Sequence, residues 1–244
     1  MSYAMTHLII ANQFAKNRKI KEKELFLLAS IAPDAVHARP DFQKELKVKS
    51  HFMQEGVKWG EIYKEKEMKD WYDELRQFYL DRADYALSEK EMAFLQGYTV
   101  HILVDIFNCQ LLYAPNLIQY GLNIEKFRED YRSECVVWDN YLYHTYEESA
   151  YLMKSMEKAL QEKLSAELLS RLRLDQEISV KNIEDNTRFQ MNLFRNSEKE
   201  KIDSLYMVTQ ENSDYFLKYV EEQCEKLLFS FPKIGNLFAT EYEE

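Results

Sequence analysis

A histidine and an aspartate, His101 and Asp105, stand four residues apart in an otherwise apolar segment that begins at Gly97. Residues at this spacing share one face of an α-helix, so the imidazole and the carboxylate point into the same part of the interior. A carboxylate buried without a partner is costly, or it shifts its pKa until it is neutral. A divalent ion removes that cost, because both groups are good ligands for zinc and similar metals. The pair therefore predicts metal ligands on a buried helix.

Three more histidines and one aspartate lie in the same half of the chain, near the ends of expected helices. His7 precedes an apolar run, Asp34 and His37 follow the helix stop at Pro33, and His51 precedes a further helical pattern. A helical bundle can gather such positions at one end of its core. Taken singly, each residue also has an ordinary reading as a core, capping or turn group. The residue pattern alone leaves metal binding and plain packing both open.

The elements that position these residues are expected to be helices. The chain of 244 residues has only 5 glycines and 4 prolines, and turn-rich all-β folds need such residues often. Ser88 and Glu91 form a capping box that opens the helix carrying His101 and Asp105. Helices are expected over residues 4–15, 22–32, 52–81, 89–113, 123–162 (in one or two pieces), 164–194 and 198–229, with a polar connection over about 34–50 and with Pro33 and Pro115 as helix ends.

These patterns predict an all-α, single-domain multi-helix bundle over residues 1–244. Residues 1–160 would form the core that holds the metal site, and residues 161–244 a helical C-terminal extension packed on it. The last residues, from Phe231 onward, are expected to form a packed tail.

The composition restricts the class of protein. The formal net charge of −10 argues against a non-specific nucleic-acid or anionic-membrane surface, but a bound metal could still attract a small anionic substrate. Cys109, Cys135 and Cys224 form neither a metal-finger pattern nor a disulfide framework. No apolar run approaches the roughly 18 residues of a membrane span, and the first residues lack a secretory-signal pattern. We expect a soluble, cytoplasmic protein, and the sequence leaves its oligomeric state open.

Four segments resemble the zinc-dependent phospholipase C family, whose metal-site fold is shared with single-strand nucleases. They are Thr6-His7-Leu8, Ser30-Ile-Ala-Pro-Asp34-Ala-Val-His37, Lys49-Ser-His51-Phe52 and Gly97-Tyr98-x-x-His101-x-x-x-Asp105, in the family's order and with similar gaps. The resemblance implies an all-helical fold of phospholipase C/nuclease type that binds up to three zinc ions and hydrolyses phosphoester bonds. Carried over by position, His51, His101 and Asp105 would hold one ion, and His7 with a bridging Asp105 would contribute to a second. Asp34 would be the acid/base carboxylate beside the attacking water, and it is also a candidate metal ligand.

Other parts of the family pattern are changed in this chain. His37 is a further candidate, either as a ligand or as a donor to phosphate. A later His-x-x-x-Glu pair of the family is matched in spacing by His144 and Glu148, which lie further downstream than in the family. The histidine that the family places shortly after the helix-borne aspartate is absent from residues 106–113. One or two ions are therefore expected rather than three, zinc or another divalent metal.

The leading expectation is a metal-dependent hydrolase, a phosphoesterase that uses a metal-activated water on a small phosphoester. Such an ion lowers the pKa of its water from about 16 toward about 7. Two alternatives belong to other classes: a non-catalytic protein that keeps a degenerate metal cluster for structure or sensing, and a helical interaction scaffold without metal. An open coordination position distinguishes the enzyme from a structural metal protein, and metal content distinguishes both from the scaffold.

Overall fold

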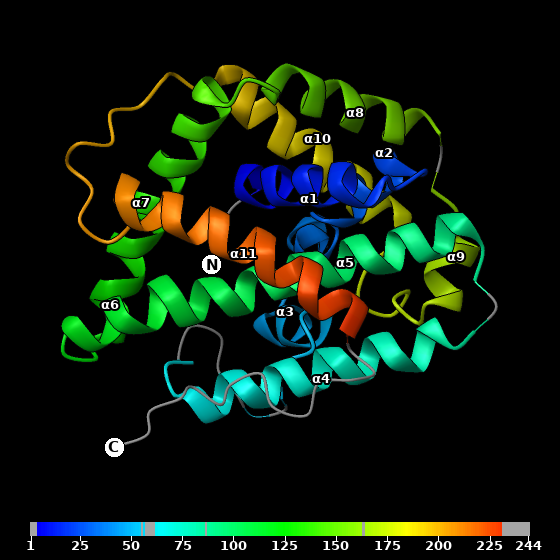
Figure 1. Ribbon diagram of the computed structural model, residues 1–244, viewed down its shortest axis with the longest axis horizontal. Coiled ribbons are helices and arrows are strands. Elements are labelled where there is room, and N and C mark those ends of the chain that lie inside the picture. The colour runs from blue at the N-terminus through cyan, green and yellow to red at the C-terminus, as the bar shows by residue number, and fades with distance from the viewer. Residues whose placement is uncertain (1–3, 55, 57–61, 86, 163, 231–244) are drawn as a thin grey trace.

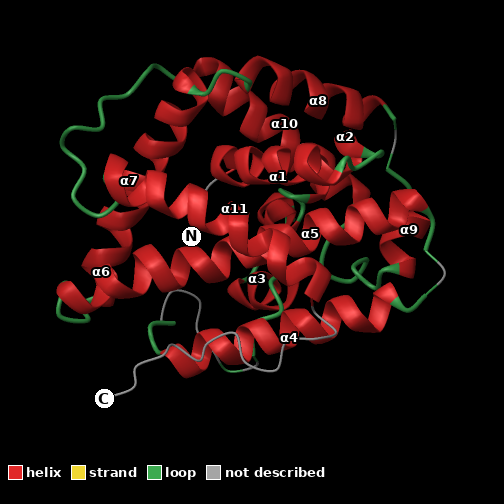
Figure 2. Ribbon diagram, viewed as in Figure 1, coloured by secondary structure: helices red, strands yellow, loops and turns green. Residues whose placement is uncertain are grey.

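The computed structural model describes residues 4–54, 56, 62–85, 87–162 and 164–230. Within these ranges every regular element is helical, which confirms the expected all-α class (Figures 1 and 2). The elements are α1 (Ala4–Arg18), α2 (Lys23–Ala29), the 3₁₀ helix η1 (Pro33–Ala38), α3 (Lys44–Ser50), α4 (Glu65–Ala83), α5 (Glu89–Asn108), the π-helical turn η2 (Cys109–Tyr113), α6 (Ala114–Gln119), α7 (Ile124–Thr145), α8 (Ser149–Gln161), α9 (Ala166–Arg171), α10 (Val180–Asn196) and α11 (Gln210–Ser230).

The helix α5 forms the centre of the molecule, and α1, α2, α4 and α11 pack around it (Figure 1). Every side chain of α5 from Ala93 to Asn108 is buried, as expected for a helix that is apolar on nearly all sides. The predicted capping box opens it: Glu91 N donates to Ser88 Oγ at 3.3 Å, and Ser88 N donates to Glu91 Oε2 at 2.7 Å. At Gly97 an added Cβ would lie 2.2 Å from the carbonyl oxygen of Phe26. The glycine therefore permits the close crossing of α2 and α5.

The segment between Pro33 and α4 differs from the prediction. The expected polar connection over 34–50 contains η1 and the whole of α3. The helix expected over 52–81 begins only at Glu65, and residues 55 and 57–61 of the expected range lie outside the described part of the chain. His51 therefore follows the end of α3, and Phe52 has a positive φ of 55° that stops the helix there.

The C-terminal half also shows where sequence patterns misplace helix ends. Pro115 does not end the helix: α5 continues through η2 into α6, and Pro115 lies in the first turn of α6, where its missing N–H is tolerated. The range 123–162 contains two helices, α7 and α8, which agrees with the expectation of one or two pieces. The range 164–194, predicted as one helix, is interrupted between α9 and α10. Only the second part of 198–229 is helical, because Glu134 of α7 accepts the backbone N–H groups of residues 206–208 and holds them as a loop.

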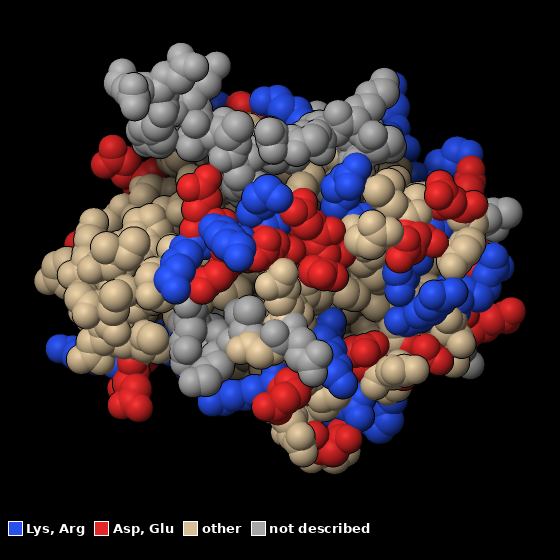
Figure 3. All heavy atoms as spheres, turned by 90° about the horizontal axis from the view of Figure 1, so that it is seen from below, with Lys and Arg blue, Asp and Glu red and all other residues tan. Residues whose placement is uncertain are grey.

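One buried apolar cluster contains residues from α1 through α11. The C-terminal helices pack on the N-terminal ones, α10 against η1 and α11 against α1 and α5. The division into a metal-site core and an extension stays a prediction, and residues 231–244 are outside the described part. None of the described helices has the length and apolar character needed to cross a membrane. On the face viewed in Figure 3, which lies below α4 in Figure 1, acidic and basic side chains are interspersed.

Candidate metal centre

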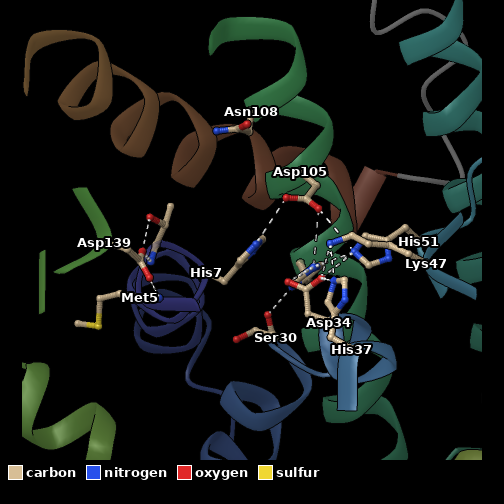
Figure 4. Close-up of polar contacts among 12 residues, drawn as sticks. Met5, His7, Ser30, Asp34, His37, Lys47, His51, Asp105, Asn108 and Asp139 are labelled. Atoms are coloured by element: carbon tan, nitrogen blue, oxygen red, sulfur yellow. Dashed lines mark hydrogen bonds and ion pairs between the residues drawn. The ribbon is translucent and has the colours of Figure 1, made fainter. Parts of the chain in front are cut away.

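Four elements bring five of the predicted site residues together beside α5 (Figure 4). His7 lies on α1, Asp34 on η1, His51 directly after α3, and His101 and Asp105 on successive turns of α5. All of them are buried except Asp34, whose side chain is 25% exposed. The one-turn spacing of the α5 pair predicted their common direction correctly. Helix α1 supplies His7, the 3₁₀ turn that begins at Pro33 supplies Asp34, and the stop after α3 supplies His51.

Four of these side chains form a cluster in which the candidate ligand atoms lie at similar separations. His51 Nε2 is 3.3 Å from His101 Nε2, 3.5 Å from Asp34 Oδ1 and 3.6 Å from Asp105 Oδ2. His101 Nε2 is 3.8 Å from Asp105 Oδ2 and 4.0 Å from Asp34 Oδ2. Ligand atoms that surround one zinc ion tetrahedrally at about 2.0–2.2 Å lie about 3.3–3.6 Å from one another. His51, His101 and Asp105 thus have nearly the spacing of three ligands of a tetrahedral site, and Asp34 lies beside both imidazoles.

His7 adds a second group of ligand atoms around the same aspartate. Its Nε2 is 3.5 Å from Asp105 Oδ1, and its ring stacks on that of His101 with centroids 3.8 Å apart. The two oxygens of Asp105 thus face different histidines, Oδ1 toward His7 and Oδ2 toward His51. One candidate ligand group comprises His7, His101 and Asp105, and the other Asp34, His51 and His101. Asp105 thus lies between His7 and His51, and its role as a bridging ligand stays a prediction.

Hydrogen bonds on the outer side of two histidines fix which ring nitrogen carries the proton. His101 Nδ1 lies 2.8 Å from the carbonyl oxygen of Ser30, which can only accept, so Nδ1 is the donor. The hydroxyl of Ser50 donates to Lys47 O at 3.2 Å, and its oxygen therefore accepts from His51 Nδ1 at 2.8 Å. Burial lowers the pKa of His101 well below its usual range and also lowers that of His51, so both rings are neutral near pH 7. Their Nε2 lone pairs consequently point into the cluster.

The two carboxylates are held in the ionised form. Burial alone would raise the pKa of Asp34, but the charge of Lys47 and the contact with His51 outweigh it and lower that pKa well below the ordinary value. In the same way, the contacts with the histidine side chains, first of all that with His7, outweigh burial and lower the pKa of Asp105. The cluster therefore presents two lone pairs and two anionic groups to one another. This donor set fits a divalent cation, which is the species that such groups stabilise when they converge.

Two neighbouring side chains hold the end of α3 and His51 in position, and one of them, Tyr98, belongs to a sequence motif. Tyr98 Oη donates to Ser50 O at 2.7 Å, and Trp71 Nε1 donates to His51 O at 2.6 Å. The Tyr98 of the Gly-Tyr-x-x-His segment thus fastens the end of α3 to α5. The role of Trp71 was not predicted, because it depends on a contact between residues 20 apart on separate elements.

Lys47 is a cation at the centre that the sequence reading missed. Its side chain is 11% exposed, and Nζ lies 2.7 Å from Asp34 Oδ1 and 3.2 Å from His37 Nε2. Burial, followed by the charge of Lys47, lowers the pKa of His37 to about 4. His37 therefore borders the cluster through Asp34 and Lys47, outside the two ligand groups formed by the described residues. The only sequence signal for Lys47 was its place four residues before His51, one helical turn away.

A second missed residue, Asp139 of α7, binds the start of α1. Its carboxylate accepts from Met5 N and Thr6 N, each at 2.8 Å, and from Thr6 Oγ1 at 2.9 Å. These bonds fix the backbone immediately before His7. Burial nevertheless raises the pKa of Asp139 to about 6. The signal in the sequence that could have identified Asp139 was its position beside Trp138 on the buried face of α7.

The downstream candidates His144 and Glu148 have other partners. His144 Nε2 contacts the backbone oxygen of Ser197 at 3.0 Å. Glu148 accepts from Asn12 at 3.1 Å and pairs with Lys16. Neither belongs to the ligand groups found among the described residues.

A cleft with a volume of about 1060 Å³ opens beside the cluster. His7, Asp34, His37 and His101 line it, together with side chains from α3, α7 and α10. The partly exposed carboxylate of Asp34 is therefore accessible to small molecules in this cleft.

Comparison with known proteins gives one match. No curated protein and no solved structure matches the chain. Residues 6–108 match the family model described as zinc dependent phospholipase C. This stretch contains all five converging residues, whereas His144 and Glu148 lie beyond it. The match confirms, over residues 6–108, the resemblance of this chain to the zinc-dependent phospholipase C family.

Proposed function

We propose that this protein is a zinc-dependent phosphoesterase that hydrolyses a small phosphoester at the cluster of Asp34, His51, His101 and Asp105. The family match and the two candidate ligand groups support a metal-dependent hydrolase. The observation that carries the proposal is the geometry of the donor set: His51, His101 and Asp105 lie at near-tetrahedral spacing with unprotonated nitrogens inward, and Asp34 lies beside them at an open cleft.

The residues divide into those that hold the ion and one that moves a proton. His51, His101 and Asp105 would hold one ion, and His7 with Asp105 a second. Zinc bound there would supply Lewis-acid stabilisation of phosphoryl charge and a water of lowered pKa. Of the two carboxylates in the cluster, Asp34 is the one that lines the cleft, with a side chain 25% exposed against 3% for Asp105. Because Lys47 keeps it ionised, Asp34 can accept a proton from a water molecule within hydrogen-bond reach.

The first experiment is elemental analysis of the purified, untagged protein beside variants of the cluster. We expect one or two equivalents of zinc in the wild type, and a loss of bound zinc in both His101→Ala and Asp105→Ala. His144→Ala is the matched control and keeps the wild-type zinc content, because His144 contacts Ser197 instead. Zinc content unchanged in both cluster variants would contradict the proposed site.

Activity is measured on the same samples with phosphomonoester and phosphodiester substrates. Asp34→Asn is expected to retain zinc and lose about 10²–10⁴-fold in kcat, the usual contribution of a general base. His144→Ala is expected to turn over like the wild type. Bound zinc without turnover of any phosphoester would overturn the catalytic proposal and identify a structural metal site.

A further inference from the structure

We propose that the cleft beside the metal centre takes a phosphoester whose organic part is uncharged and carries a hydrogen-bond donor beside an acceptor, as a carboxamide or a lactam ring does. Three amide side chains of α7 and α10, those of Asn140, Asn186 and Gln190, bind this polar edge. The inference rests on the proposed function and specifies the class of substrate. All three residues lie outside residues 6–108, so the family match does not include them.

The amides of α10 lie on the side of the cleft that adjoins the metal centre. Asn186 and Gln190 are four residues apart on one face of α10, and both line the cleft together with Asp34. Helix α10 packs against η1, the element that carries Asp34. Asn182, one turn before Asn186, donates to the carbonyl oxygen of Ala38 in η1 at 3.5 Å. A ligand whose phosphoryl group lies at the cluster can therefore extend along α10.

The amide of Asn186 lacks the partner that a buried amide normally has. Asn186 is only 6% exposed, yet its side chain forms no hydrogen bond with any residue in the described part of the chain. Buried polar groups in folded proteins are nearly always hydrogen-bonded, because leaving one without a partner costs free energy. The half-buried amides of Asn140 and Gln190 also form no hydrogen bond within the described ranges. Three such amides in one cleft indicate a ligand that supplies their partners.

The chemistry of the amide indicates what kind of group is bound. Each amide presents a carbonyl oxygen that accepts and an NH₂ group that donates. A ligand edge with a donor beside an acceptor satisfies both, whereas an apolar group or a quaternary ammonium group leaves the amide without a partner. Phe189 and Leu193 of α10 also line the cleft, 57% and 48% exposed, and offer an apolar surface to the body of the ligand. The ligand class is thus a phosphoester with an apolar body and an amide-like edge.

Two phosphonates that contain no hydrolysable bond test this recognition apart from catalysis. We would measure binding of phenylphosphonate and 4-carbamoylphenylphosphonate to the zinc-loaded full chain by calorimetry, after removal of excess zinc. The wild type is expected to bind the carbamoyl compound about tenfold more tightly, the effect of two neutral hydrogen bonds. In Asn186→Leu this preference is expected to disappear. The variant keeps the side-chain volume and removes no hydrogen bond to a described residue, so it should unfold at the same denaturant concentration as the wild type.

Gln190→Met is the second variant, at a half-buried position, and is expected to weaken the same preference. Asn192→Leu is the matched control, because Asn192 is exposed on α10 and does not line the cleft. It is expected to bind both phosphonates like the wild type. Equal binding or no binding of the two phosphonates by the wild type, or a preference that both cleft variants retain, would overturn the inference.

Turnover of phenyl phosphate, assayed on the same samples, separates this inference from the proposed function. A preference for the carbamoyl compound without turnover would refute the proposed function alone. Turnover without a preference would refute the amide site alone.

Discussion

Asp139 shows how one buried carboxylate can set both the position and the pH response of a neighbouring element. It accepts three hydrogen bonds at the first turn of α1, just before His7. Such bonds favour the ionised form, yet burial outweighs them and the pKa rises to about 6. The folded chain therefore binds a proton at Asp139 more tightly than the unfolded chain does.

This pKa leads to a prediction of how stability changes with pH. A raised carboxyl pKa contributes stability that is fully present below about pH 4 and is lost as the pH rises through about 6. The loss for Asp139 is at most about 3 kcal/mol. We expect Asp139→Asn, which has no proton to lose, to lack this component. Urea unfolding of both proteins from pH 4.5 to 7.5 measures it, because the titration of other groups cancels in the difference.

The sign of the difference is the critical result. The free energy of unfolding of the wild type, relative to Asp139→Asn, should fall as the pH rises from 4.5 to 7. A difference that stays constant, or one that increases with pH, would show that the three hydrogen bonds rather than burial control this carboxyl.

At the scale of the elements, the crossing of α2 and α5 determines where His101 lies. Gly97 is one turn before His101, and an added Cβ there would lie 2.2 Å from Phe26 O and 2.9 Å from Ala29 Cβ. The two helices would have to separate, since backbone atoms cannot move aside as a side chain can. We expect Gly97→Ala to lower the free energy of unfolding by about 2–3 kcal/mol, near the upper end of overpacking costs.

Gly121→Ala is the comparison variant for this crossing. Gly121 has a φ of 64° and open space around the added Cβ, so only backbone strain of about 1 kcal/mol is expected. Equilibrium denaturation of both variants separates the two costs. A loss below that of Gly121→Ala would mean that the crossing is not close packed at Gly97.

Local sequence signals predicted which side chains come together better than they predicted where the helices begin and end. The one-turn spacing of His101 and Asp105 and the Ser88 capping box are local, and the structure agrees with both. Lys47, Trp71 and Asp139 could not be placed in the same way, because their contacts depend on how separate helices pack. The prediction of a helix end at Pro115 was wrong for a related reason, because a π-helical turn before this proline accommodates it.

The C-terminal half shows the same limit more strongly. The charged pattern over 198–229 predicts a continuous helix, yet residues 206–208 donate their backbone N–H groups to Glu134. A carboxylate on another helix thus replaces the helical hydrogen bonds of this segment. No periodicity within the segment contains that information, since Glu134 precedes it by about 70 residues.

At the scale of the whole molecule, the centre joins α1, η1, α3 and α5, in addition to their apolar packing and the hydrogen bond from Tyr98 to Ser50. It places each of two carboxylates within 4.0 Å of two inward nitrogen lone pairs. Without a cation the charges of this set repel, and with one they attract. Metal binding is therefore expected to stabilise the assembly of the N-terminal half, in addition to any catalytic role.

Removing zinc should consequently lower the thermal stability of the entire chain. A ligand at 100 times its Kd stabilises the folded state by about 2.7 kcal/mol, and for a chain of this size that corresponds to about 5–10 °C in Tm. We expect a chelator to lower the Tm of the wild type and of His144→Ala by this amount, and added zinc to restore it. His101→Ala should melt at the same temperature with or without the chelator, because it has lost the ion already. Equal chelator effects on His101→Ala and the wild type would place the stabilising ion elsewhere in the molecule.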